Sequence, residues 1–374
     1  MTKSTVQVDL FGLPISPDRL RRAREMRGLT QAELARAAEV DQSHIAVLES
    51  GSRQPSATVL GSLARVLELP VSYFHQPMRA ALSGGTLRYR ARADLGKRAA
   101  ARIRSEAEHF LDLVVFLSEK VNRVPTRVLP ASVDPVKAAN SLRRIMQPDP
   151  NGPLPHLVRN FEKLGGIVLA LDSQDRFDAF AEWGGKYREL PLVAIADGAP
   201  PDRLRLSVAH EIGHLVLHRD SFISEKFAER EAFVFASALL MPPESITHDF
   251  ESIGTSLDAL LELKRKWGVS VQSLVRCARD IGSISDRHYR TLNARISKLG
   301  WKREEPPVAN RFDERPLAVK RMAEVAFGSP LPFPLMAKAL HVPESQLRRF
   351  FSRYGTESKE SSFRAEVTSS QLLQ

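Results

Sequence analysis

The sequence predicts a mainly α-helical protein that contains one small β-sheet, an α+β chain. Helical periodicity and helix-ending signals run through residues 17–124 and 256–350, whereas short β-branched or alternating runs are confined to 167–197. A chain of 374 residues is too long for a single core, so two or three domains are expected.

The overall composition is typical of a globular protein, with 43% hydrophobic and 26% charged residues. No apolar run approaches the roughly 20 residues that span a bilayer, and the first residues lack the apolar stretch of a secretion signal. The sequence therefore predicts a cytoplasmic protein with no membrane partner. A lone cysteine, Cys277, can form neither an internal disulfide nor a cysteine metal site.

The net charge of +10 is concentrated in two segments. Residues 79–104 contain eight basic residues and one acid, and residues 264–303 contain eleven basic residues and two acids. Such segments favour contact with a polyanion, and DNA is the obvious one. The alternative is that each segment is a solvated helix face.

Residues 17–75 contain five short helical patterns separated by turn signals. Pro17 opens the first pattern and Gly28 closes it, as these residue types commonly do. Asp41 is placed to cap the third pattern. The second and third patterns resemble a helix-turn-helix, a fold in which the start of the second helix enters the major groove. The residues expected to contact DNA are Gln31, Gln42, Ser43, His44, Val47 and Arg53.

Three of these side chains have distinct expected roles. Gln42 could read adenine through a bidentate pair of hydrogen bonds, and Arg53 would suit a backbone phosphate. Gln31 is placed either for a phosphate or for bracing Gln42. Residues 335–351 have a related spacing and could form another helix-turn-helix, although a plain helical hairpin is favoured.

Residues 19–74 resemble the Xre-type helix-turn-helix family of phage repressors and Cro. The resemblance rests on Leu-Thr-Gln-x-Glu-Leu-Ala at 29–35, Leu-Glu-x-Gly at 48–51 and Pro55. It implies binding to double-stranded DNA, with a homodimer reading two half-sites about 34 Å apart. The alternative is a helix-turn-helix that serves only protein association.

A proline-rich break at 147–155 predicts the start of a new unit. The expected strands after it are 167–172, 177–183 and 191–197. One expected helix starts after Pro201 and runs to about 217, and a second covers about 226–240. The expected units are a helix-turn-helix domain at 1–78, a helical connector at 79–147, a metallopeptidase-like domain at 148–250, a helical extension at 251–352 and a disordered tail at 353–374.

The most informative motif is His210-Glu211-Ile212-Gly213-His214. On a helix, His210 and His214 lie one turn apart on one face, so both imidazoles can reach one metal ion. Glu211 lies beside that face, where a carboxylate can accept the proton of a water molecule. The alternative is a helix whose histidines are simply structural, or a metal site without turnover.

A catalytic zinc ion needs three protein ligands, and Glu231 on the following helix is the preferred third ligand. Glu225 and Glu229 stay possible ligands. His218 lies about 12 Å along the helix from His210, so it cannot share a metal with that residue unless the helix breaks. A structural or supporting role is therefore favoured for His218.

The runs RLRLSVAHEIGHLVLH (203–218) and EREAFVFASALLMP (229–242) resemble the ImmA/IrrE family of metallopeptidases, and the likeness covers about 150–305. It implies a zincin-like endopeptidase domain with one Zn²⁺ per chain. His210, His214 and Glu231 would be the ligands and Glu211 the general base. Family members act on DNA-binding repressors, so such a protein substrate is implied. Phe233 departs from the family, where a polar residue is common, which leaves substrate preference open.

The sequence therefore favours a DNA-binding regulator whose zinc-dependent endopeptidase domain cleaves a repressor-type protein. The alternative is a non-proteolytic transcription factor or antitoxin whose peptidase-like domain senses a metal or another ligand. A substrate would extend along an edge strand, 179–183 being the candidate. Tyr187 and nearby histidines are candidates to stabilise an oxyanion, with little to separate them.

Overall fold

The structure is a computed structural model that describes residues 14–82, 96–121, 133–172, 177–185, 189–198, 200–219, 224–307 and 314–355. The predicted disordered tail lies outside the described residues from 356 onward. The same holds for Tyr187 and for much of the first basic segment, at 83–95.

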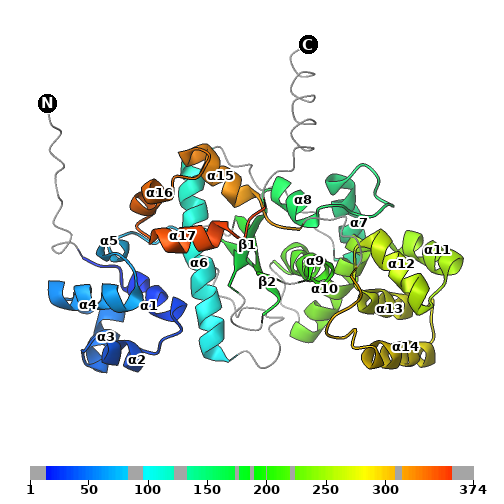
Figure 1. Cartoon of the computed structure of the whole chain (residues 1–374), viewed down its shortest axis with the longest axis horizontal. Coiled ribbons are helices and arrows are strands. Elements are labelled where there is room, and N and C mark those ends of the chain that lie inside the picture. The colour runs from blue at the N-terminus through cyan, green and yellow to red at the C-terminus, as the bar shows by residue number, and fades with distance from the viewer. Residues whose placement is uncertain are drawn as a thin grey trace, which may run out of the picture.

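The predicted α+β class is confirmed, because helices dominate the described residues and one small sheet accompanies them (Figure 1). The first helices are α1 (Pro17–Met26), α2 (Gln31–Ala37), α3 (Gln42–Glu49), α4 (Ala57–Leu67), α5 (Val71–Phe74), α6 (Lys97–Lys120), α7 (Pro135–Met146) and α8 (Leu157–Lys163). The strands are β1 (Ile167–Leu171), β2 (Ala179–Gly184) and β3 (Leu190–Ala196). The later helices are α9 (Pro201–Leu217), α10 (Glu225–Leu240), α11 (Pro243–Ile253), α12 (Leu257–Trp267), α13 (Val271–Asp280), α14 (Asp286–Lys298), α15 (Ala318–Phe327), α16 (Phe333–Leu340) and α17 (Glu344–Phe351).

The five predicted N-terminal helices are present as α1 to α5, and local capping explains where several begin. Thr30 and Glu33 form a reciprocal capping box at the start of α2, which satisfies two backbone N–H groups that the helix leaves unpaired. Asp41 occupies the N-cap position of α3, as expected, but its side chain makes no capping hydrogen bond. That detail of the sequence interpretation is corrected.

The sheet has the strand order β1-β3-β2, with β1 parallel to β3 and β2 antiparallel to β3. Strand β2 therefore lies at an edge. Alternate side chains of β1 enter different cores, since successive residues of a strand point to opposite faces. Ile167, Leu169 and Leu171 belong to one core, whereas Val168 and Ala170 belong to the other.

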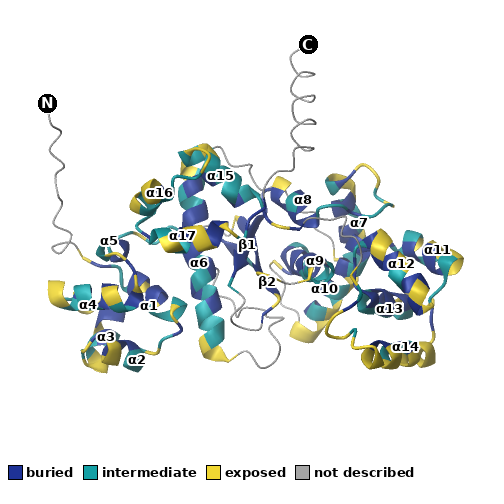
Figure 2. Ribbon diagram, viewed as in Figure 1, coloured by how far each residue is buried: buried dark blue, intermediate teal, exposed yellow. Residues whose placement is uncertain are grey.

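Two hydrophobic cores thus lie on opposite faces of the sheet. The first core joins α1–α5, α6 and α15–α17 into one apolar body, and the second joins α7–α14. Figure 2 shows buried residues along the sheet and α9, and exposed residues along α14. The helix-turn-helix unit is consequently packed onto the rest of the protein through α6.

The helical extension expected over 251–352 contributes to both cores. Helices α11 to α14 pack on the second core, whereas α15 to α17 pack against α6 on the first. Two buried acids hold the segment that leads into α15 against α8 and α9. Glu162 accepts hydrogen bonds from the backbone N–H groups of Leu317 and Ala318 at the start of α15. Glu314 accepts from the N–H groups at the start of α8 and forms a buried ion pair with Arg205.

None of the helices in the described part of the chain combines the length and the apolarity that crossing a bilayer requires.

Candidate metal centre and nucleic-acid interface

Helices α9 and α10 lie side by side, and a missing side chain sets how closely they approach (Figure 1). A Cβ atom on Gly213 would lie 3.3 Å from the Cα atom of Ala232 and 3.0 Å from the ring of Phe235. Those separations are near the lower limit for carbon atoms in contact. Gly213 therefore permits the close approach that brings α10 side chains to the histidine face of α9.

Two imidazole nitrogens and one carboxylate converge where these helices meet. The Nε2 atoms of His210 and His214 are 3.1 Å apart. The carboxylate of Glu229 lies 3.1 Å from His214 Nε2 and 3.3 Å from His210 Nε2. Zinc with bonds of about 2.0–2.1 Å in tetrahedral geometry separates its donor atoms by about 3.3 Å. The spacing of the three side chains therefore fits a tetrahedral divalent cation with a further coordination position left over.

The electrostatics of this group favour a charged carboxylate. His210 and His214 are buried, and Glu229 is partly buried. Burial raises the pKa of Glu229, but hydrogen bonds from His210 and His214, together with their charge, outweigh burial and hold that pKa below its usual range. Glu229 is thus held in its charged, carboxylate form.

The position of Glu229 revises the third ligand chosen from the sequence. Glu231 lies against His218 instead, with its Oε2 atom 3.0 Å from His218 Nε2. Residues two apart on a helix project in directions about 200° apart, so the two carboxylates reach different parts of α9. Glu229 therefore takes the place of Glu231 as the candidate third ligand. The candidate set still consists of two histidines and one carboxylate.

His218 connects the two groups. Its Nδ1 atom is 3.0 Å from Nδ1 of His214, the ring nitrogen that faces away from the cluster. A chain of contacts therefore runs from the cluster through His214 and His218 to Glu231. Metal-binding histidines commonly engage a partner through the second ring nitrogen, which fixes the orientation of the ring. The supporting role expected for His218 agrees with this placement.

Glu211 is almost completely buried on α9, between the two histidines in sequence. The ring of Phe233 lies 4.5 Å from that of His210, and the guanidinium of Arg276 lies 4.0 Å from the centre of the Phe233 ring. Sequence reasoning did not select Arg276. Only the second basic segment could have pointed to it, because α13 is remote from the motif in sequence.

The residues predicted to contact DNA lie on α2, α3 and the loop after α3. Gln42, Ser43 and Arg53 are exposed, His44 is half-buried and Val47 is 37% exposed. Gln42 and Ser43 occupy the first turn of α3, the position from which such a helix reaches base edges.

In the structure, Gln31 contacts Glu49 and not Gln42. Its Nε2 atom donates a hydrogen bond to the carboxylate of Glu49, at 2.9 Å. Arg24 also holds this buried carboxylate, through contacts of 2.6 and 2.9 Å. Gln31 therefore ties α2 to α3 and α1 through Glu49, and a contact of Gln31 with a DNA phosphate stays a prediction.

Comparison with protein families agrees with both parts of the geometry. Residues 20–74 match the helix-turn-helix family model, and residues 170–278 match the peptidase M78 model, described as an IrrE N-terminal-like domain. The chain fuses an Xre-type helix-turn-helix domain to an IrrE-like peptidase domain. The IrrE-like match contains β2, β3 and the whole histidine–glutamate cluster. A search of curated proteins found no match.

Proposed function

We propose that the protein is a DNA-binding transcriptional regulator whose IrrE-like domain is a zinc-dependent endopeptidase acting on a protein, specifically a repressor-type regulator. The convergence of His210, His214 and Glu229 at the spacing of tetrahedral ligands carries the proposal. The helix-turn-helix domain on the same chain supports a regulatory setting for the cleavage.

Each residue of the centre has a chemical task in this proposal. His210, His214 and Glu229 would hold one zinc ion, and His218 with Glu231 would orient His214. The zinc ion would supply a Lewis acid that polarises the scissile carbonyl and lowers the pKa of the attacking water. Glu211 would accept the proton of that water and deliver it to the leaving amine.

The substrate would extend along β2, because this strand lies at the edge of the sheet and contacts α9. Such a strand offers backbone groups to an added peptide strand. At the C-terminal end of β2, Leu82 forms an antiparallel bridge with Gly184. The stretch 179–183 is therefore the proposed docking edge.

The DNA-binding part of the proposal concerns Gln42, Ser43 and their neighbours on α3. A homodimer would place two such helices in successive major grooves, about 34 Å apart. Gel-shift titration with palindromic DNA duplexes that differ in the spacing between their half-sites tests this geometry. Binding that is independent of half-site spacing would contradict it.

The decisive test of the peptidase uses the purified full chain. We expect about one zinc per chain by elemental analysis and cleavage of a co-resident helix-turn-helix repressor. Glu211→Gln should keep the metal but lower the cleavage rate about 10²- to 10⁴-fold, the usual contribution of a general base. Glu225→Gln is the matched control, since Glu225 is exposed in the first turn of α10. A zinc-free protein that cleaves no repressor would remove the enzymatic proposal.

A second candidate is a non-proteolytic regulator in which the centre senses a metal ion. The burial of His210 beneath Phe233 and the bridge between Leu82 and Gly184 favour it, because both restrict approach to the cluster and its edge strand. Zinc binding that alters operator affinity, without cleavage and equally in Glu211→Gln, would support this candidate over the peptidase.

A further inference from the structure

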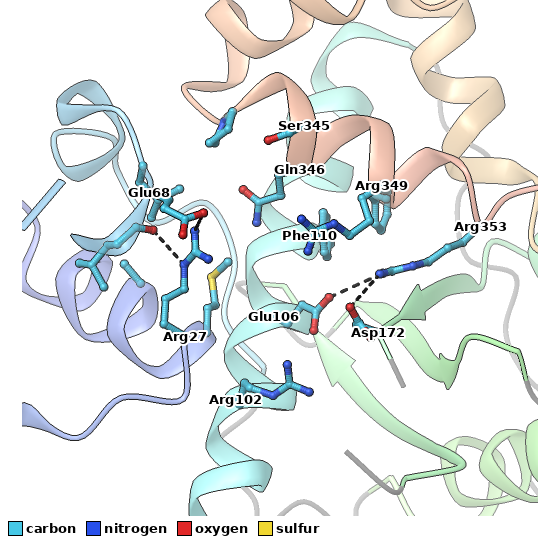
Figure 3. A pocket seen from close by; sticks show the side chains of 16 residues that line it. Arg27, Glu68, Arg102, Glu106, Phe110, Asp172, Ser345, Gln346, Arg349 and Arg353 are labelled. Atoms are coloured by element: carbon cyan, nitrogen blue, oxygen red, sulfur yellow. Dashed lines mark hydrogen bonds and ion pairs between the residues drawn. The ribbon is translucent and has the colours of Figure 1, made fainter. Parts of the chain in front are cut away.

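A cavity of about 430 Å³ lies where the helix-turn-helix unit, α6 and α17 meet (Figure 3). Helices α1 and α4 form one wall, α6 forms the base, and α17 forms the opposite wall. Neither α6 nor α17 belongs to the two segments matched by the family models. The volume lies in the range of about 300–1,000 Å³ that is usual for small-molecule sites.

Most charges in the cavity wall neutralise one another. Arg27 forms an ion pair with Glu68, at 2.9 Å. Arg353 lies 3.4 Å from a carboxylate oxygen of Asp172 and 3.7 Å from one of Glu106. Both acids therefore lie at the side of the cavity where Arg353 enters (Figure 3). A second negative charge on a ligand would be repelled there.

The wall formed by α17 is different. Arg349 also lines the cavity, and among the described residues its guanidinium has no carboxylate within ion-pair distance. Gln346 lies one turn earlier on α17 and lines the same cavity. A guanidinium with an amide one turn away can bind one carboxylate through charge-assisted hydrogen bonds.

The base of the cavity is apolar and rigid. The ring of Phe110 stacks on that of Phe350, with centroids 3.8 Å apart and planes 13° from parallel. Both rings are buried and both line the cavity, together with Met26 from α1. An aromatic or short apolar group would be removed from water on this surface.

We propose that this cavity binds a small organic monocarboxylate with an aromatic body. Arg349 and Gln346 hold the carboxylate, and Phe110 and Met26 contact the ring. Because its walls come from α1 and from α17, a bound ligand favours one orientation of the helix-turn-helix unit on the rest of the protein. The cavity is thus an effector site separate from the metal centre.

The test measures binding to the purified full chain by calorimetry and by thermal unfolding. The probes are benzoate, phenylacetate and indole-3-acetate. Phenylacetamide replaces the carboxylate with a neutral amide, and inorganic phosphate offers the charge without the ring. We expect at least one carboxylate to bind with a Kd below about 1 mM and to raise the Tm, and neither control compound to do so.

Two neighbouring residues of α17 supply the matched variants. Arg349→Gln should weaken carboxylate binding about tenfold through loss of the charged hydrogen bond. Arg348→Gln should leave binding unchanged, because Arg348 pairs with Glu344 and lies over Phe333. Both arginines are exposed, so neither change should prevent folding. The proposal is overturned if no carboxylate binds, if a control compound binds equally well, or if Arg349→Gln binds like wild type. Neither DNA binding nor peptidase activity enters these measurements.

Discussion

The junction of α9 and α10 and the exposed surface of α3 hold their functional side chains in opposite ways. At the junction, His210, His214 and Glu229 are gathered around one point and touch one another. On α3, Gln42 and Ser43 project into solvent from the first turn. Packing therefore orients the first group before any ligand arrives, whereas the proposed DNA contacts of the second group would orient its side chains on binding.

The largest expected effect concerns the carboxylate that touches both histidines. Glu229→Gln removes the anionic donor of the cluster, and we expect more than about a hundred-fold loss of zinc affinity. Competition with a chromophoric chelator measures this loss. Glu225→Gln serves as the control on the same helix and should bind zinc like wild type. Equal affinities for Glu229→Gln and wild type would show that another residue completes the site.

Glu231 provides the comparison within α10. Because it touches His218 and not the cluster, Glu231→Gln should leave one zinc per chain and lower the affinity by about 10- to 100-fold. The same chelator competition measures it. If Glu231→Gln lost zinc more completely than Glu229→Gln, the original sequence-based ligand set would be restored.

The spacing of the histidine motif alone places both imidazoles on one helix face. The sequence could therefore select His210, Glu211 and His214 as candidate site residues. Residues four apart on one helix share a face whatever surrounds them. The choice between Glu229 and Glu231 instead depends on how α10 is rotated against α9. The close contact of Gly213 with Ala232 is part of that packing, and it joins residues that the sequence pattern alone does not pair.

The same distinction applies to the fold. Helix periodicity and β-branched runs predicted the helices and the three strands, because these signals are local. The sequence did not indicate that α15 to α17 join the core of the helix-turn-helix unit. Nor did it indicate that Gln31 contacts Glu49, since α2 and α3 meet there through tertiary packing.

Gly213 should also affect stability. Gly213→Ala places a methyl group 3.0 Å from Phe235 and 3.3 Å from Ala232, so the Phe235 ring or the backbone at Ala232 must move by a few tenths of an ångström. We expect the free energy of unfolding to fall by about 1–2 kcal/mol, since overpacking outweighs the better helix propensity of alanine. Gly61→Ala is the matched control within α4. Nothing lies within 4 Å of its added methyl group, so it should stabilise the protein by about 0.5–1 kcal/mol. Denaturant titration compares them, and two stabilising changes would disprove the tight contact.

The smallest effects are expected on the exposed surface. Gln42→Ala should cost about 1 kcal/mol of binding to one cognate sequence, because it removes a contact to a base edge. Arg53→Ala should instead weaken binding to all sequences and reduce the salt dependence of binding, because a phosphate contact carries no sequence information. Fluorescence anisotropy with cognate and random duplexes at several salt concentrations separates these outcomes. Both residues are exposed, so neither change should alter the fold. Equal losses on both duplexes for both variants would mean that α3 approaches DNA without reading it. The surface of α3 would then differ from the α9–α10 junction both in the exposure of its side chains and in its lack of ligand specificity.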